Sequence, residues 1–173
     1  ALDPGVVERL HGDTLRLGRL VDDLYQLSMS DLGALSYRMA PTDVGEVLEA
    51  DLDAMRPRFA AAGLTLSLED RRRSRTDVQA DPERLSQLFR NLLRNSLQYT
   101  DPGGGLKVCI DQVGTRILVD FQDTAPGVPP EALGQLFERL YRVDQSRSRH
   151  TGGAGLGLAI AKNVAEAHGG RIS

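Results

Sequence analysis

The 173-residue sequence has one cysteine and no tryptophan, and only 5% of its residues are aromatic. A single thiol excludes a disulfide framework, and one cysteine with three scattered histidines makes no zinc site. Cys109 lies in a strand-like run, where buried packing is its expected role. The formal net charge is −3. This argues against a nucleic-acid binder, because such proteins are normally basic and carry stacking aromatics.

The sequence also lacks an apolar run long enough to span a bilayer, and its N-terminus carries no signal-peptide pattern. Hydrophobic residues make up 40% of the chain, which is typical of a globular domain. We therefore expect a soluble piece of one domain, or of one domain with an appendage. Any membrane attachment would come from other parts of a longer parent protein.

Residues 5–31 are predicted to form one helix. A heptad pattern, broken only by Asp13, places apolar residues at Val6, Leu10, Leu17, Leu20, Leu24 and Leu27. Such a stripe either packs on its own domain or pairs with another helix or another chain. The second interpretation is favoured, because nothing obvious in the sequence could cover a single long N-terminal helix. Extended residues before Pro41 place a boundary near 33–37.

The middle of the chain alternates helix and strand. Asp43 is the predicted N-cap of a helix, with Glu46 completing a capping box and Gly63 ending the helix. Residues 64–68 alternate as a strand with one buried face, and a second short strand is predicted over 76–80. The basic run 71–75 between them is predicted to be a solvated turn.

The clearest helix starts after Asp81, with Pro82 at its first position, and ends at Thr100. Its predicted core face is Leu85, Leu88, Phe89, Leu92, Ser96 and Tyr99. At about 100° per residue, Asn91, Asn95 and Gln98 form a second stripe beside that face. This placement is unusual for plain solvated residues and indicates a functional role.

A glycine-rich stretch, residues 152–157, opens the last predicted helix after a polar loop. It matches neither the dinucleotide-binding spacing nor a P-loop. On its own it could be a helix-packing turn, but a glycine turn at a helix N-terminus also suits a phosphate. Before it, strands over 106–110 and 117–121 form a hairpin, and a short helix begins near Pro129.

Several polar residues could act together with this turn. Asn91 and Asn95, one helical turn apart, offer amide oxygens to a cation such as Mg²⁺. Asp123 at a strand end could accept from an amine, Gly127 would let a flat ligand approach the backbone, and Arg142 could reach a terminal phosphate. Taken singly, each has an ordinary alternative as an exposed or turn residue.

In this order the motifs resemble the ATP-binding domain of sensor histidine kinases of two-component systems, within the GHKL ATPase group. Residues 87–100 are similar to the family's N box and 123–127 to its first glycine box. Residues 136–142 are similar to its F box and 153–158 to its second glycine box. Residues 20–28 resemble the second helix of the family's dimerisation and histidine-phosphotransfer domain.

The resemblance implies a role for each residue. Asn95 would be the Mg²⁺ ligand, Asn91 would lie beside the phosphates, Tyr99 would pack near adenine, and Asp123 would accept from the adenine amine. Tyr141 and Arg142 would belong to a lid over ATP, with Arg142 towards the γ-phosphate. The remaining implied ATP-binding residues are Gly127, Gly153, Gly155, Leu156, Gly157 and Leu158. The loop 144–151 would be the mobile part of the lid.

The resemblance also implies the fold and the domains. The fold would be an α+β two-layer sandwich, the Bergerat or GHKL ATP-binding fold, with a mixed sheet covered on one face by helices. Residues 1–35 would be the remnant of the dimerisation domain. Residues 36–173 would be the catalytic domain, truncated before its last strands.

The parent protein would be a homodimeric sensor in a bacterial inner membrane, with this domain in the cytoplasm. It would transfer the γ-phosphoryl of ATP to a histidine and then to the receiver domain of a response regulator. Alternatives are another GHKL ATPase and a degenerate interaction module without nucleotide.

Three departures from the family pattern stand out. Gln98 replaces a frequent lysine, and Ala125 replaces a glycine. The phosphoacceptor motif, His followed by Glu-Leu-Arg-x-x-Pro, is absent, since His11, His150 and His168 have no such context. This polypeptide is therefore expected to bind ATP and Mg²⁺ without phosphorylating itself. His168 is predicted to be a cation near a helix C-terminus.

Overall fold

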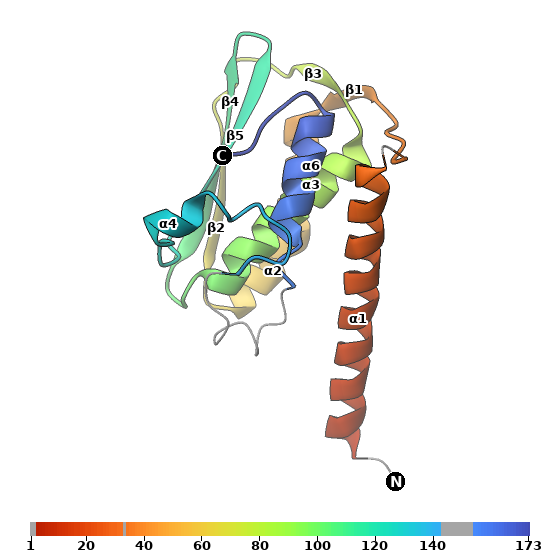
Figure 1. The fold of residues 1–173 in the computed structure, drawn as a ribbon. Helices are drawn as coiled ribbons and strands as arrows, with labels where there is room; N and C mark the ends of the chain where they lie inside the picture. The colour runs from red at the N-terminus through yellow and green to blue at the C-terminus, as the bar shows by residue number, and fades with distance from the viewer. Residues whose placement is uncertain (1–2, 33, 143–153) are drawn as a thin grey trace.

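The computed structural model describes residues 3–32, 34–142 and 154–173, and it shows a two-layer domain with a long helix at one side (Figure 1). The long helix is α1 (Pro4–Asp31). The helices of the domain are α2 (Val44–Ala61), α3 (Pro82–Tyr99), α4 (Pro130–Leu133) and α6 (Gly157–Ala167). Its strands are β1 (Ala40–Asp43), β2 (Thr65–Asp70), β3 (Asp77–Ala80), β4 (Gly105–Val113) and β5 (Arg116–Asp123).

The strands form two sheets. β1 pairs with β3 antiparallel, whereas the larger sheet has the order β2-β4-β5. β2 runs parallel to β4, and β5 returns antiparallel to β4 through a tight turn in which Gly114 has φ +64°. Helices α2, α3 and α6 lie on one face of this mixed sheet (Figure 1). The predicted two-layer fold is therefore confirmed.

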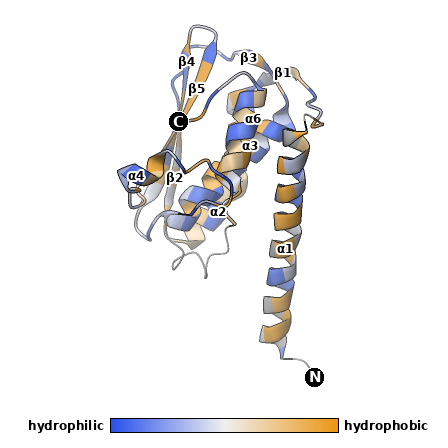
Figure 2. Ribbon diagram, in the orientation of Figure 1, coloured by the Kyte–Doolittle hydropathy of each residue, from blue (hydrophilic) through white to orange (hydrophobic). Residues whose placement is uncertain are grey.

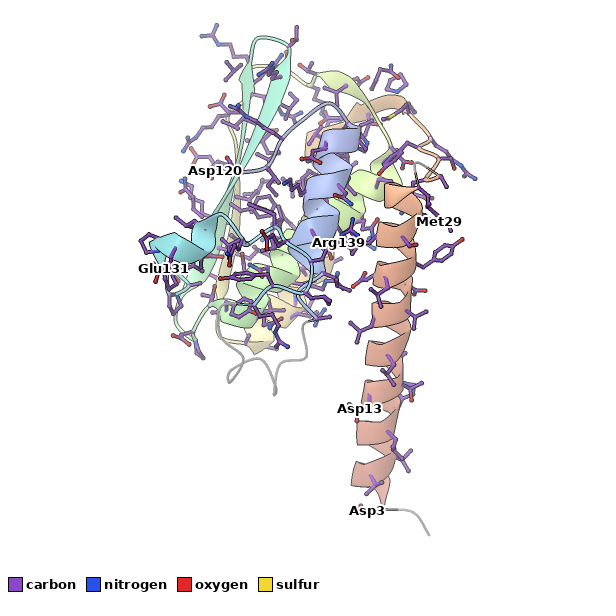
Figure 3. The ribbon with its side chains drawn as sticks, in the orientation of Figure 1. Asp3, Asp13, Met29, Asp120, Glu131 and Arg139 are labelled. Carbon is purple, nitrogen blue, oxygen red and sulfur yellow. The ribbon has the colours of Figure 1, made fainter. Side chains whose placement is uncertain are left out.

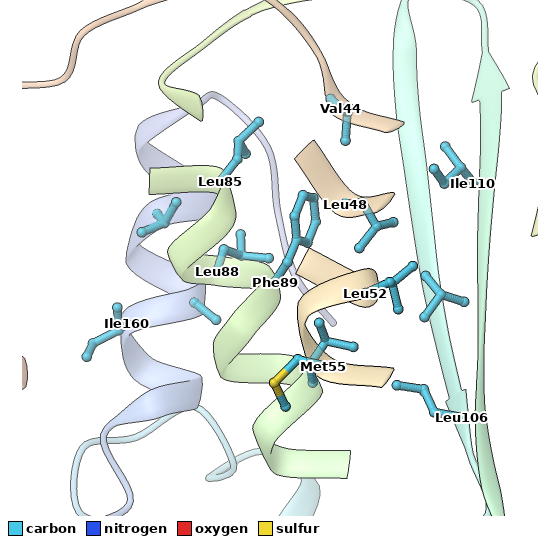
Figure 4. Close-up of a cluster of buried hydrophobic side chains, with 14 of the residues drawn as sticks. Val44, Leu48, Leu52, Met55, Leu85, Leu88, Phe89, Leu106, Ile110 and Ile160 are labelled. Carbon is cyan, nitrogen blue, oxygen red and sulfur yellow. The ribbon is translucent and has the colours of Figure 1, made fainter. Parts of the chain in front are cut away.

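The hydrophobic core lies between that sheet and the helices (Figure 4). The predicted stripe of α2 is buried at Val44, Leu48, Leu52, Met55 and Phe59, and it packs with Leu85, Leu88 and Phe89 of α3. Val108 and Ile110 of β4 are fully buried beneath them. Leu93 of α3 is also fully buried, although the predicted face of that helix passed through Leu92. The strand residue Cys109 is buried, as predicted.

Helix α1 projects beyond the domain and has hydrophobic residues along its length (Figure 2). Asp13 lies in its free part and Asp3 just before its first residue, whereas Met29 lies at the end near the domain (Figure 3). Only Leu27 of the predicted stripe is buried, and Leu10, Leu17 and Leu24 are 58%, 62% and 52% exposed. The stripe therefore does not pack on its own domain over most of its length. None of the described helices is long and apolar enough to cross a membrane.

The start of α2 corrects one sequence prediction. The Asp43 carboxylate caps the helix by accepting from the Gly45 N–H at 2.7 Å, as predicted. Arg72, predicted to lie in a solvated turn, is buried instead and donates to Asp43 at 2.7 Å and to Asp70 at 2.7 Å. The physical reason is that a capping carboxylate with a side-chain exposure of 5% needs a cation beside it.

The end of α6 corrects a second prediction. His168 Nε2 accepts a hydrogen bond from the backbone N–H of Asp81 at 2.9 Å, so that nitrogen carries a lone pair. The other ring nitrogen, Nδ1, lies 2.7 Å from the Val164 carbonyl oxygen and donates to it. His168 is therefore a neutral imidazole that joins α6 to the start of α3, and the prediction of a cation at this position is wrong.

Asp81 and His168 also bind the segment that follows α1, at Arg38 and Tyr37. The Asp81 carboxylate caps α3 by accepting from the N–H of Glu83 and Arg84, and it also accepts from the Arg38 N–H at 2.8 Å. Burial raises the pKa of Asp81, but these N–H donors outweigh it and the net pKa is lowered. The Tyr37 ring packs edge-on against His168 with centroids 5.6 Å apart. The segment between α1 and β1 is thus attached to the domain where α3 begins and α6 ends.

Candidate nucleotide-binding site

The polar stripe of α3 lies beside the core face, as predicted. Asn91 is 4% exposed, and Asn95 and Gln98 are half-buried. The amide oxygen of Asn91 accepts from the Arg94 guanidinium. Its amide nitrogen is buried and has no hydrogen-bond partner in the described part of the chain. Such an unpaired buried donor is costly, and it suits a ligand that brings an acceptor.

The N-terminus of α6 lies next to Asn91. A Cβ built on Gly157 would lie 3.7 Å from the Asn91 amide oxygen, which is an ordinary contact distance, so the start of α6 lies against Asn91. Leu156, in the N-cap position, provides no side-chain hydrogen bond. The first N–H groups of a helix have no partner within the helix, and together with the helix dipole they favour an anion. Leu156 itself is a core residue, and Leu158 is half-buried.

Gly155 has a structural role that the sequence did not indicate. Its φ is +72°, and a Cβ there would lie 2.7 Å from the Tyr141 carbonyl oxygen. Its own carbonyl accepts from the Leu140 N–H at 2.9 Å. Gly155 therefore joins the segment after α4 to the start of α6. The contact of its amide with phosphate stays a prediction.

Replacing Gly155 with alanine is expected to lower the free energy of unfolding by about 1–3 kcal/mol, because the added methyl group would collide with backbone atoms at a φ that alanine rarely adopts. The midpoint of chemical denaturation and the ATP affinity of the variant would measure the loss. Gly134→Ala is the matched control, since its Cβ would meet nothing within 4 Å and its φ is −65°. Equal stability of the two variants would contradict this role of Gly155 in joining the segment after α4 to the start of α6.

Arg142 also has unpaired donors. Its Nε and Nη2 are buried and lack a hydrogen-bond partner among the residues that the structure describes. A guanidinium in this state favours an anionic ligand. Tyr141, its neighbour, and Tyr99 on α3 are half-buried. Gly153 and the predicted lid loop 144–151 lie outside the described residues.

Asp123 ends β5 and faces α3. Its Oδ2 accepts from the Ser96 hydroxyl at 2.7 Å, and its Oδ1 accepts from the Ala125 N–H at 3.3 Å. Ser96 was predicted only as a core-facing residue, and its side chain is indeed buried. Its contact with Asp123 joins residues 27 positions apart, which no local pattern could reveal.

Gly127 is exposed, and neither packing nor a positive φ requires glycine there. Its role towards a flat ligand stays a prediction.

The part of the chain that the structure describes has no cluster of three His, Cys, Asp or Glu side chains that could hold a metal. A cation here would need an amide oxygen together with ligand phosphates. Mg²⁺ accepts such a set, and Asn95 fits it better than Asn91, whose oxygen is bound to Arg94.

A mixed sheet, an open helix N-terminus and unpaired buried donors beside it define a two-layer nucleotide-binding domain. The family model of the histidine kinase-, DNA gyrase B- and HSP90-like ATPases matches residues 80–173. The chain belongs to this family.

The individual relatives include a histidine-protein kinase and a sensor protein. The signal transduction histidine-protein kinase BaeS of Escherichia coli is 50% identical over 98% of this chain and 36% of its own length. The sensor protein SphS of Synechococcus elongatus is 38% identical over 96% of this chain and 42% of its own length. The chain thus spans less than half of either relative.

Solved structures give the same result. The histidine kinase AdeS of Acinetobacter baumannii superposes with a TM-score of 0.79 at 26% identity, over 96% of this chain and 75% of that chain. Full-length ShkA in complex with AMPPNP superposes with a TM-score of 0.78 at 30% identity, over 95% of this chain and 33% of that chain. The predicted resemblance to sensor histidine kinases is confirmed.

Proposed function

We propose that this chain is the ATP-binding catalytic part of a two-component sensor histidine kinase. The observation that carries the proposal is the corner formed by α3 and α6. There, the buried Asn91 amide nitrogen and the uncapped N-terminus of α6 both present donors, and Gly155 and Tyr141 connect this corner to the buried Arg142 guanidinium. A triphosphate supplies the acceptors and the negative charge that these groups lack.

Each end of the nucleotide would have its own contacts. Asp123 would accept from the exocyclic amine of adenine, with Tyr99 packed nearby. Asn95 would hold Mg²⁺ together with the phosphates, and Arg142 and Tyr141 would lie towards the γ-phosphate. Bound in this way, Mg²⁺ would neutralise phosphate charge as the γ-phosphoryl is transferred. The protein's contribution would be positioning and fixed positive charge.

The N-terminal helix supports the rest of the proposal. An exposed leucine stripe on α1 (Leu10, Leu17 and Leu24) suits pairing with further helices of a dimerisation domain. We therefore assign residues 1–35 to that domain and 36–173 to the catalytic domain. In the whole protein, the phosphoryl group would pass to a histidine and then to a response regulator. The whole protein would be a homodimeric sensor of the bacterial inner membrane, with this domain in the cytoplasm.

Nucleotide titration of this chain tests the proposal. ATP is expected to bind with Mg²⁺, to bind more weakly after chelation with EDTA, and to bind better than GTP. Asn95→Ala is expected to remove most of the Mg²⁺ dependence, whereas Gln122→Ala on the exposed end of β5 is expected to retain it. Absence of ATP binding to the unmodified chain would favour the alternative of a non-catalytic interaction module.

A further inference from the structure

Ser96 follows Asn95 directly on α3, and its side chain is only 3% exposed. Its hydroxyl does not simply fill the core. It donates to Oδ2 of Asp123 at 2.7 Å, across the gap between the helix and the end of β5. A polar contact at a buried helix position has to be accounted for, because an alanine would fill the same space without needing a partner.

The contact fixes the orientation of a carboxylate whose backbone is already fixed. Asp123 is in register with Leu106 of β4, and the Thr124 N–H donates to the Gly105 carbonyl at 3.1 Å. Rotation about the side-chain bonds of Asp123 is then the main way in which the direction of its carboxylate can still change. Ser96 holds one carboxylate oxygen, and the more distant Ala125 N–H, at 3.3 Å, holds the other.

The direction of this hydrogen bond has a chemical consequence. An ionised carboxylate can only accept, so the Ser96 hydroxyl must donate. Each carboxylate oxygen keeps lone pairs for a further donor. The held carboxylate therefore presents acceptors in one fixed direction, which suits an exocyclic amine and opposes a carbonyl oxygen in the same place.

We infer that Ser96 is a positioning residue for base recognition, which orients Asp123 so that the site selects a purine with a 6-amino group. The inference rests on the proposed function, since it takes Asp123 to be the contact to the base. Ser96 itself would not touch the base. Its effect would therefore depend on the presence of the 6-amine, whereas a purely structural hydroxyl would affect all nucleotides alike.

The same helix provides a matched control. The Ser86 hydroxyl donates to the buried Asp51 carboxylate at 2.9 Å, and Asp51 also accepts from Arg90 at 2.6 Å. This second serine–carboxylate contact joins α3 to α2 and lies within the helical layer. Ser86→Ala thus removes the same chemical contact at a place with no assigned ligand.

The experiment compares ATP with purine riboside 5′-triphosphate, which lacks only the 6-amine, in titrations of the unmodified chain, Ser96→Ala and Ser86→Ala. The unmodified chain is expected to prefer ATP. Ser96→Ala is expected to lose roughly 3- to 10-fold in ATP affinity, the value of one hydrogen bond, and to bind the analogue unchanged. Ser86→Ala is expected to keep the full preference for ATP. If Ser96→Ala does not fold, Ser96→Cys offers a similar size with only a weak donor and is expected to show the same selective loss.

Three results would count against the inference. An equal loss of affinity for both nucleotides in Ser96→Ala would show that the hydroxyl only stabilises the fold. A full preference for ATP in that variant would show that Asp123 needs no support. An unmodified chain that binds both nucleotides equally would overturn the proposed contact between Asp123 and adenine, and the role of Ser96 with it. The first two results leave the proposed function intact.

Discussion

Replacement of Arg72 with alanine is expected to lower the free energy of unfolding by about 3–5 kcal/mol, the usual cost of breaking a buried ion pair from one side. The side chains of Arg72 and Asp43 are 4% and 5% exposed. Without the guanidinium, the carboxylate that caps α2 stays buried without a cation. One Asp43 oxygen already lacks a hydrogen-bond partner among the described residues. Urea denaturation monitored by circular dichroism would measure the change.

Two further variants make this prediction specific. Arg71→Ala, one residue away, removes a pair with Glu69 whose side chains are 48% and 43% exposed, and it is expected to cost less than about 1 kcal/mol. Adding Asp43→Asn to Arg72→Ala is expected to recover part of the loss, because asparagine caps a helix without a charge. An equal loss of unfolding free energy in Arg71→Ala and Arg72→Ala would show that the buried ion pair stabilises the fold no more than the exposed one.

The effect of Arg72→Ala should also depend on pH. Burial raises the pKa of Asp43, but hydrogen bonds from Arg72 and the Gly45 N–H, with the Arg72 charge, bring the net pKa below its ordinary 3.8. A lowered folded-state pKa stabilises the protein above the unfolded-state value, and this contribution is lost as the pH falls through the folded-state value. The difference in stability between the unmodified chain and Arg72→Ala is therefore expected to shrink below about pH 4.

Local patterns predicted most of the elements correctly. Asp43 and Asp81 were recognised as N-caps because a cap depends on the few residues that follow it. Gly63 was recognised as the end of α2, and it has a φ of +70°. The order of the glycine-rich and asparagine-containing motifs also indicated the fold and the family. These signals are short in sequence and need no knowledge of tertiary structure.

The residues whose contacts could not be predicted all depend on distant partners. Arg72 meets Asp43 only because β2 returns beside the start of α2, 29 positions away. His168 accepts from the N–H of Asp81, 87 positions away, so its charge state could not be read from its place at a helix end. Ser96 looks like any small core-facing residue until β5 places Asp123 beside it. Tertiary structure decides the chemistry at each of these positions.

Asp123→Asn is expected to lower the ATP affinity by about 10- to 100-fold, the range for losing a hydrogen bond to a charged group. The amide has one oxygen where the carboxylate has two, and its NH₂ group repels the adenine amine. Isothermal titration with ATP and GTP would measure the change, and GTP affinity is expected to change much less. Asp120→Asn, three residues earlier on β5, is the control, because its carboxylate contacts Gln122 and faces away from α3.

The fold should tolerate Asp123→Asn, and the ATP affinity of this variant therefore measures base recognition and not stability. An asparagine oxygen can still accept from the Ser96 hydroxyl, and the backbone pairing of Asp123 with Leu106 does not involve the side chain. A normal melting temperature together with weak ATP binding would assign the loss to the base contact. Unchanged ATP affinity would remove Asp123 from the site. The polar contacts to the nucleotide would then be those to its phosphates, from Arg142, Asn91 and the start of α6.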